Sequence, residues 1–226
     1  MTTSGTTAFN LDLVEIAEEC FERCGAEMRA GYDLRTFRRS MNLLLTEWAN
    51  RGVNLWTLEQ GTIPLVAGTA TYDLPADTVD LVEHVTRTGT GSSQQDINLT
   101  RISVSTYATI PNKTSTGRPL QVWIERLNTP RLTVWPVPDN STPYTIVYWR
   151  LRRIQDAGEG VNTPDLPFRF LPALIAGCTY HLALKISGAL ERIPMLKAQY
   201  DEAWDLASSE DREKAAVRFV PRSFRV

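Results

Sequence analysis

The hydrophobic pattern of this chain changes its period twice, and that change constrains the fold more than any other feature of the sequence. Apolar residues recur at steps of three or four over residues 14–28 and 34–48, which predicts two amphipathic helices. From about Val53 apolar and polar residues alternate instead, as is typical of half-buried strands. After Gly160 the helical period returns. The sequence therefore predicts an α+β fold in which helical segments flank a β region.

The ends of the first two helices are predicted from capping residues. Asn10 is the predicted N-cap of the first helix, with Asp12 and Glu15 in its first turns, where the helix dipole favours acidic groups. Gly31 is expected to end that helix and Asp33 to cap the second. Because the connection is so short, the two helices are expected to form an antiparallel hairpin.

The β region is predicted from alternation and turn residues. Residues 57–65 and 69–74 flank a short turn and predict a β-hairpin. Further strands are predicted at 79–88, 121–125, 131–135 and 144–153, with a helical turn at 103–108. Together these segments predict a meander of antiparallel strands.

These patterns divide the chain into four segments. They are a helical hairpin at 8–52, an inserted β domain at 53–160, C-terminal helices at 161–217 and an extended arm at 218–226. The two helical segments are expected to form one antiparallel bundle from both chain ends. The inserted domain is expected to be an antiparallel sheet or sandwich.

Composition excludes several classes of protein. The 226 residues are enough to bury a core, and 24 basic side chains nearly balance 26 acidic ones. A general nucleic-acid coat would need a large positive excess. No run approaches the ~18 apolar residues of a membrane span, and the polar N-terminus does not resemble a secretory signal. The three cysteines cannot all pair, which fits a reducing compartment.

Residues that carry chemistry are few and form no recognisable motif. His84 and His181 are the only histidines, and neither lies in a nucleophile motif. Cys20 and Cys24 are four residues apart on one helix, but a structural zinc site needs four ligands, so both are predicted to be packing residues. Asp77 is predicted to belong to a turn. The sequence therefore predicts no catalytic residue, no metal site and no cofactor.

Aromatic side chains cluster in the β region and leave three interpretations open. They are Trp123, Trp135, Tyr144, Tyr148 and Trp149. Either they fill the core of a β-sandwich, or they contact a neighbouring subunit, or they face outward and stack on sugars.

The C-terminal segment alternates large apolar and cationic residues. A free tail has no reason to keep its phenylalanines, whereas a segment that docks in an extended form uses alternate side chains to fill pockets. The alternative is a frayed terminus. The candidate binding residues are Arg218, Phe219, Pro221, Arg222, Phe224, Arg225 and Val226.

Charge is distributed unevenly over the two N-terminal helices. The first thirty residues have a net charge of −4, whereas the second helix carries Arg35, Arg38 and Arg39 on or near its polar face. Contacts between subunits are one interpretation, with Glu18 and Glu22 as the acidic partners. The alternative is a solvated helix face.

Several short stretches occur in order along most of the chain. They are LLLTEW (43–48), GVNLW (52–56), ATYDLPAD (70–77), IPNK (110–113), GRP (117–119), VWPVPD (134–139), YWRLRRI (148–154), PFRFLPAL (167–174) and DREK (211–214). In this order, over roughly residues 35–222, the chain resembles the head-to-tail adaptor (connector) proteins of short-tailed phages.

The resemblance implies a structural protein of the virion, assembled in the host cytoplasm, and not an enzyme. Such adaptors form a ring, usually dodecameric, below the portal protein. Their helical parts stack laterally, and their C-terminal arm, here 218–226, reaches the portal. Their β region faces tail nozzle or fibre proteins. DNA passes through the channel without sequence-specific binding, and neither a cofactor nor a membrane is involved.

Two other functions stay open at this stage. One is a peptidoglycan-degrading tail protein that uses a pair of Asp or Glu residues. The other is a carbohydrate-binding β module that uses Trp123 or Trp135. The adaptor hypothesis is the one that the extent of the resemblance favours.

Overall fold

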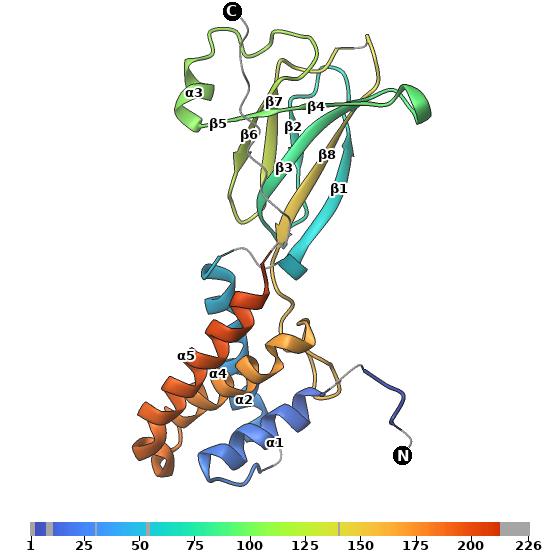
Figure 1. The fold of residues 1–226 in the computed structure, drawn as a ribbon. Coiled ribbons are helices and arrows are strands. Elements are labelled where there is room, and N and C mark those ends of the chain that lie inside the picture. Colours follow the sequence, from blue (N-terminus) through green and yellow to red (C-terminus); the bar gives the residue numbers. More distant parts are fainter. Residues whose placement is uncertain (1–2, 8–10, 30, 53–54, 140, 213–226) are drawn as a thin grey trace, which may run out of the picture. The chain divides into compact units, whose positions relative to one another are not determined.

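The computed structural model describes residues 3–7, 11–29, 31–52, 55–139 and 141–212. It divides into two compact units (Figure 1). Met1–Trp48 with Asp156–Val226 form the first, which we call the helical unit, and Ala49–Gln155 form the second, which we call the β unit. Over the described residues the fold is α+β, as the sequence predicts.

The first helix, α1 (Leu13–Cys24), begins at a capping box. The Asp12 carboxylate accepts a hydrogen bond from the Glu15 backbone N–H at 2.8 Å, and the Glu15 carboxylate accepts one from the Asp12 N–H at 3.0 Å. This reciprocal pair satisfies two backbone donors of the first turn. Asp12 is therefore the N-cap, and the expected cap, Asn10, lies outside the described residues.

The connection between the first two helices differs from the prediction. Helix α1 ends at Gly25, which has a φ of 75°, and not at Gly31. The earlier glycine terminates the helix because it adopts the left-handed conformation without the steric cost of a Cβ. Helix α2 (Tyr32–Asn50) then begins before Asp33, whose carboxylate accepts a hydrogen bond from the Arg29 N–H at 2.7 Å.

Helix α4 (Leu171–Ala183) is the central helix of the helical unit. It contacts both α1 and α5 (Ile193–Glu210), and most of its residues are buried. A Cβ on Gly177 would lie 2.8 Å from Leu44 of α2 and 2.9 Å from Tyr200 of α5. The missing side chain is therefore what lets α2 and α5 approach α4 at this point.

An aromatic cluster forms the core where these helices meet. Trp48 is fully buried, and its ring centroid lies 4.8 Å from that of Trp204 and 5.8 Å from that of Phe170. Its indole N–H donates a hydrogen bond of 2.9 Å to the Tyr200 hydroxyl, which donates in turn to Glu47 at 3.2 Å. The polar end of the buried tryptophan is thus satisfied, as burial requires.

The β unit contains two four-stranded sheets (Figure 1). The first has the order β1 (Leu58–Pro64), β8 (Tyr144–Arg152), β3 (Thr78–Thr88), β4 (Gln95–Asn98), and the second the order β2 (Thr71–Asp73), β7 (Arg131–Trp135), β6 (Gln121–Glu125), β5 (Thr100–Ile102). Helix α3 (Val104–Thr109) follows β5, at the place of the predicted helical turn. Short 3₁₀ segments lie at Leu55–Thr57, Gly91–Ser93, Phe168–Phe170 and Ser187–Arg192.

The predicted hairpin of residues 57–65 and 69–74 is wrong. Strand β1 pairs with β8 in one sheet, and β2 pairs with β7 in the other. The turn between them exists, since the Tyr72 hydroxyl donates to the Val66 carbonyl at 3.2 Å and to the Thr69 carbonyl at 2.8 Å. The turn connects a strand of one sheet with a strand of the other. Alternation in the sequence does not distinguish such a connection from a hairpin.

The meander is also only partly correct. The hairpin of β6 and β7 forms as predicted, with Gln121 opposite Trp135. However, β5 pairs with β6 in parallel, and β7 and β8 belong to different sheets. The apolar core of the β unit consists of Leu74, Leu81, Leu99, Val122, Ile124, Leu132, Val134, Ile146 and Tyr148.

Candidate interaction surface

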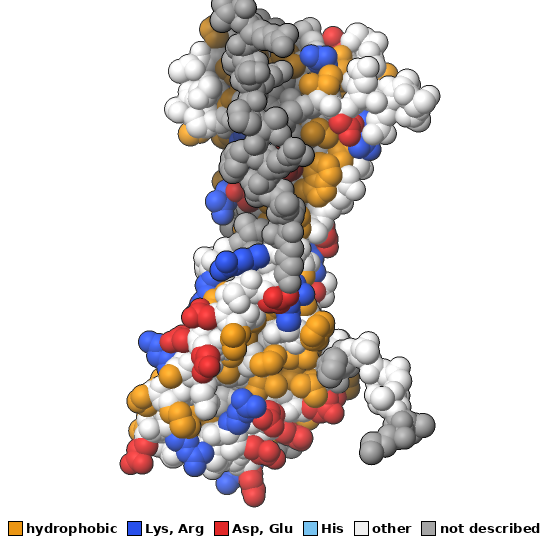
Figure 2. Space-filling model, viewed as in Figure 1, with side chains coloured by type: hydrophobic (Ala, Val, Ile, Leu, Met, Phe, Trp, Pro, Cys, Tyr) orange, Lys and Arg blue, Asp and Glu red, His pale blue; other side chains and the backbone are white. Residues whose placement is uncertain are grey.

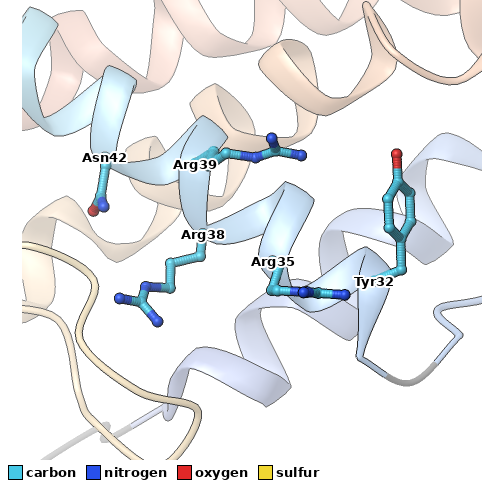
Figure 3. A pocket seen from close by; sticks show the side chains of 5 residues that line it. All are labelled: Tyr32, Arg35, Arg38, Arg39 and Asn42. Carbon is cyan, nitrogen blue, oxygen red and sulfur yellow. The ribbon is translucent and has the colours of Figure 1, made fainter.

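Three arginines project from the exposed face of α2 and line a groove. Arg35, Arg38 and Arg39 share it with Tyr32 and Asn42, and its volume is about 470 Å³ (Figure 3). The positions recur at steps of three or four, so they lie on one face of the helix. The groove is open to solvent and lined by hydrogen-bond donors, which suits a partner that presents acidic groups.

The local contacts of this groove leave its charge uncompensated. Arg35 donates to the Gly31 carbonyl and Arg39 to the Thr36 hydroxyl, both at 3.3 Å. Among the residues that the structure describes, no carboxylate forms an ion pair with Arg35, Arg38 or Arg39. The groove is therefore a concentrated patch of positive charge.

A lysine extends the positive charge beside α2. The Lys185 ammonium donates a hydrogen bond of 2.7 Å to the Ser40 hydroxyl. Burial lowers the pKa of Lys185, and the positive charge of Arg39 lowers it further. Lys185 and Arg39 are thus like charges close enough to interact on this side of α2.

The acidic residues of α1 fall into two groups. Glu15 belongs to the capping box, and Glu19 forms an ion pair of 2.7 Å with Arg23. Glu18 and Glu22 are exposed and form no ion pair with any described residue. The two acidic residues predicted for contacts between subunits are thus the two carboxylates of α1 that form no described ion pair or cap.

Helix α5 carries a second acidic surface, which the sequence analysis did not single out. Asp201, Glu202 and Asp205 are exposed and have no ion-pair partner within the described ranges. Acidic side chains can be followed along α5 in Figure 2. The available signal was that these residues lie on the face opposite the apolar stripe of Leu196 and Tyr200.

Two carboxylates of the β unit, those of Asp77 and Glu59, form ion pairs with one arginine. Arg150, whose side chain is 12% exposed, lies 2.5 Å from the Asp77 carboxylate and 2.8 Å from that of Glu59. The hydrogen bond from Arg150 lowers the pKa of Asp77. A carboxyl group whose pKa is held low is poorly suited to donate a proton at neutral pH. This arrangement favours a structural role for Asp77.

His84 is an unusual buried group of the β unit. The residue is 6% exposed, and neither ring nitrogen has a hydrogen-bond partner among the described residues. Burial lowers the pKa of His84, and the nearby charge of Arg101 adds to this effect, while Glu83 and Asp80 oppose it. The neutral imidazole is therefore the form that the folded β unit accommodates.

This histidine predicts a loss of stability in mild acid. The pKa of His84 in the folded chain lies below its ordinary value of 6.5, so the unfolded chain binds the proton first as the pH falls. We expect the free energy of unfolding of the β unit to be constant with respect to His84 above pH 6.5. Below that pH it should decrease by up to about 1.4 kcal/mol per pH unit, until the folded form also protonates.

Urea denaturation of the β unit at pH 7.5 and pH 5.5 measures this loss. In His84→Leu the loss should disappear, whereas the matched variant of the other histidine, His181→Asn, should retain it. An unchanged loss in His84→Leu would assign the acid sensitivity to another group.

The three cysteines are buried and free. The thiols of Cys20 and Cys24 contact the backbone carbonyls of Ile175 and Thr179 at 3.5 and 3.6 Å. Burial raises the pKa of Cys20 to about 12. They are packing residues, as predicted, and no group of three His, Cys, Asp or Glu side chains in the described part of the chain could hold a metal ion.

The aromatic residues of the β unit divide between core and surface. Tyr144 and Tyr148 are buried, whereas the tryptophans are half-buried. Trp123 stacks on Tyr107 with ring centroids 4.8 Å apart, and the Trp135 indole N–H donates to the Asn112 carbonyl at 3.0 Å. Core packing thus accounts for the tyrosines but not for the tryptophans.

The predicted arm lies outside the described residues. All of its candidate residues, from Arg218 to Val226, belong to the segment 213–226. No helix of the described part is both long and apolar enough to cross a membrane.

A comparison with protein families finds a match over most of the chain. The family model described as SU10 adaptor protein matches residues 14–222, and the matched range runs through both units. A comparison with curated proteins finds no match.

Proposed function

Because this chain belongs to the SU10 adaptor protein family of phage head-to-tail adaptors, we propose that it forms a ring, dodecameric as in adaptors of this kind, that joins the portal to the tail. Its passage would let DNA through during ejection. The family match over residues 14–222 is the observation that carries the proposal, because it extends through both the helical unit and the β unit. The chain is then a structural component of the virion, with its β unit toward the nozzle or fibre proteins.

A ring needs two different surfaces on each copy, because its contacts are head-to-tail and closed. The helical unit offers a basic surface at Arg35, Arg38 and Arg39, and exposed carboxylates on two helices, at Glu18 and Glu22 of α1 and on α5. We assign the lateral contacts of the ring to this unit. Ion pairs that form only in the ring would give these arginines the carboxylate partners that they lack among the described residues of a single copy.

The arm is the part of the chain that we assign to the portal. Its three arginines and two phenylalanines combine charge with apolar anchors, the two kinds of group that dominate protein interfaces.

The net charge of the whole chain is −2, which disfavours retention of DNA by phosphate contacts.

Deletion of residues 218–226 tests this assignment. We expect the full-length chain to bind the purified portal protein and to form rings that electron microscopy shows. The affinity of the truncated chain for the portal protein should be at least about 100-fold lower, because several anchors of about 1–3 kcal/mol each are removed. Co-sedimentation with the portal measures the loss.

Circular dichroism should show that the truncated chain keeps both units folded. Ser223→Ala within the arm is the matched control and should leave attachment unchanged. A truncated chain that still co-sediments would remove the arm from the portal interface. A full-length chain that forms no ring with the portal would contradict the adaptor function itself.

A further inference from the structure

Helices α2 and α5 each carry three exposed side chains of one charge that form no ion pair within the described part of the chain. Arg35, Arg38 and Arg39 line the groove of α2. Asp201, Glu202 and Asp205 lie exposed on α5. The two sets are equal in number, and among the described residues of a single copy neither set has an ion-pair partner.

The two charged faces point away from each other. Leu44 of α2 and Tyr200 of α5 both approach Gly177, and the Trp48 indole donates to the Tyr200 hydroxyl. The buried stripes of the two helices are therefore directed toward one another and toward α4. On each helix the charged residues lie opposite the buried stripe, so one charged face cannot reach the other in the same copy.

The two sets also match in length. The arginines lie at positions i, i+3 and i+4 along α2, and the carboxylates lie at i, i+1 and i+4 along α5. Both sets span about 6 Å along their helix axes, given a rise of 1.5 Å per residue. Within one copy α2 and α5 run in the same direction, because Ser40 of α2 lies beside Lys185 after α4, whereas Trp48 packs on Phe170 before α4 and on Trp204 of α5. Neighbouring copies of a ring differ by a small rotation, so α2 of one copy and α5 of the next also run in the same direction, and Arg35 can pair with Asp201 and Arg39 with Asp205.

We propose that the arginine groove of α2 in one copy binds the acidic face of α5 in the next copy, with the two helices running in the same direction. This inference rests on the proposed adaptor function and names the contact that builds its ring. Because the two faces are different and point in opposite directions, the contact propagates from copy to copy and does not stop at a symmetric dimer. Arginine with carboxylate is also the ion pair that forms with the best directed hydrogen bonds.

The acidic residues of α1 are the competing partner for the same arginines. Glu18 and Glu22 supply two carboxylates for three arginines, whereas α5 supplies three over the same length of helix. A nucleic-acid phosphate is a third chemical possibility for a groove of arginines. Charge complementarity within the chain favours α5.

Charge reversal on each face, followed by mixing, tests the contact. One variant carries Arg35→Glu, Arg38→Glu and Arg39→Glu, and the other carries Asp201→Lys, Glu202→Lys and Asp205→Lys. Each variant alone would present like charges at every contact, so we expect neither to form rings on the portal. An equimolar mixture should recover ring formation, because alternating copies again place opposite charges together.

Three controls make the outcome specific. Glu18→Lys with Glu22→Lys should still form rings. The single variants Arg38→Glu and Asp201→Lys should show the same mutual rescue if a triple variant does not fold. A short DNA duplex should bind the arginine variant and the wild-type chain equally.

Rings from either triple variant alone, or no recovery in the mixture, would overturn the proposal. Loss of rings in the Glu18 and Glu22 variant would make α1 the partner in place of α5. Loss of DNA binding in the arginine variant, with rings intact, would make the groove a phosphate site. If the wild-type chain itself forms no ring on the portal, the adaptor function fails, and this contact fails with it.

Discussion

Replacing Trp48 with alanine is expected to lower the free energy of unfolding of the helical unit by about 3–5 kcal/mol. The side chain is fully buried, and its ring packs against Trp204 and Phe170. Removing it leaves a cavity at the meeting point of α2, α4 and α5, and leaves the Tyr200 hydroxyl without its indole donor. Urea denaturation followed by far-ultraviolet circular dichroism measures the change.

The control for this prediction is a second α2 residue that faces solvent. Leu43 is 62% exposed, so Leu43→Ala should change the free energy of unfolding by less than about 0.5 kcal/mol. The transition of the β unit should be the same in both variants, because Trp48 belongs to the helical unit. A cost below about 1 kcal/mol for Trp48→Ala would mean that the aromatic cluster is not the core of the helical unit.

The helices of this fold could be predicted from the sequence because they are defined by local periodicity. The apolar stripe that contains Phe37, Met41 and Trp48 is buried as expected. The helix ends were predicted less well, because Gly25 and Gly31 both suit a C-cap and only the first adopts that role in the fold. Local signals thus identified the helices but not which of two equivalent stops the chain uses.

The pairing of strands could not be predicted from the sequence, and the reason is physical. Alternation shows that a segment has one apolar face. Strands β1 and β2 can bury that face equally well as a hairpin or in separate sheets. Their partners, β8 and β7, lie more than fifty residues away in the chain. Contacts of that range depend on the packing of the two sheets as a whole, which no short window of sequence contains.

Of the candidate surface, the basic face could be predicted from the sequence and the acidic face could not. Three arginines at i, i+3 and i+4 on one helix face indicate a basic surface by spacing alone, and the structure places Arg35, Arg38 and Arg39 in one groove. The acidic face of α5 could not be predicted as a binding surface, because most surface helices carry exposed carboxylates on their polar face. The acidic face becomes a candidate binding surface only once the helix packing is known, because the packing directs Asp201 and Asp205 away from the arginines of the same copy.

Gly177→Val is the second substitution with a large expected effect, and it connects the core with the candidate surface. A side chain at an ordinary helical glycine gains helix propensity, since glycine costs about 1 kcal/mol relative to alanine. Here a Cβ would lie 2.8 Å from Leu44 and 2.9 Å from Tyr200, and both of these side chains are buried. Overpacking should outweigh propensity and lower the free energy of unfolding by about 1–3 kcal/mol.

The same substitution should also weaken the ring, because Gly177 sets how closely α2 and α5 approach α4. Valine would move one of these helices outward and so shift the arginine groove relative to the acidic face that the next copy must meet. Gly188→Val is the matched control, because a Cβ at Gly188 would meet no atom within 4 Å. We expect ring formation on the portal to fall in Gly177→Val and to persist in Gly188→Val, at a temperature where circular dichroism shows both variants folded. Equal ring formation by the two variants would show that the spacing of the charged faces does not depend on this contact.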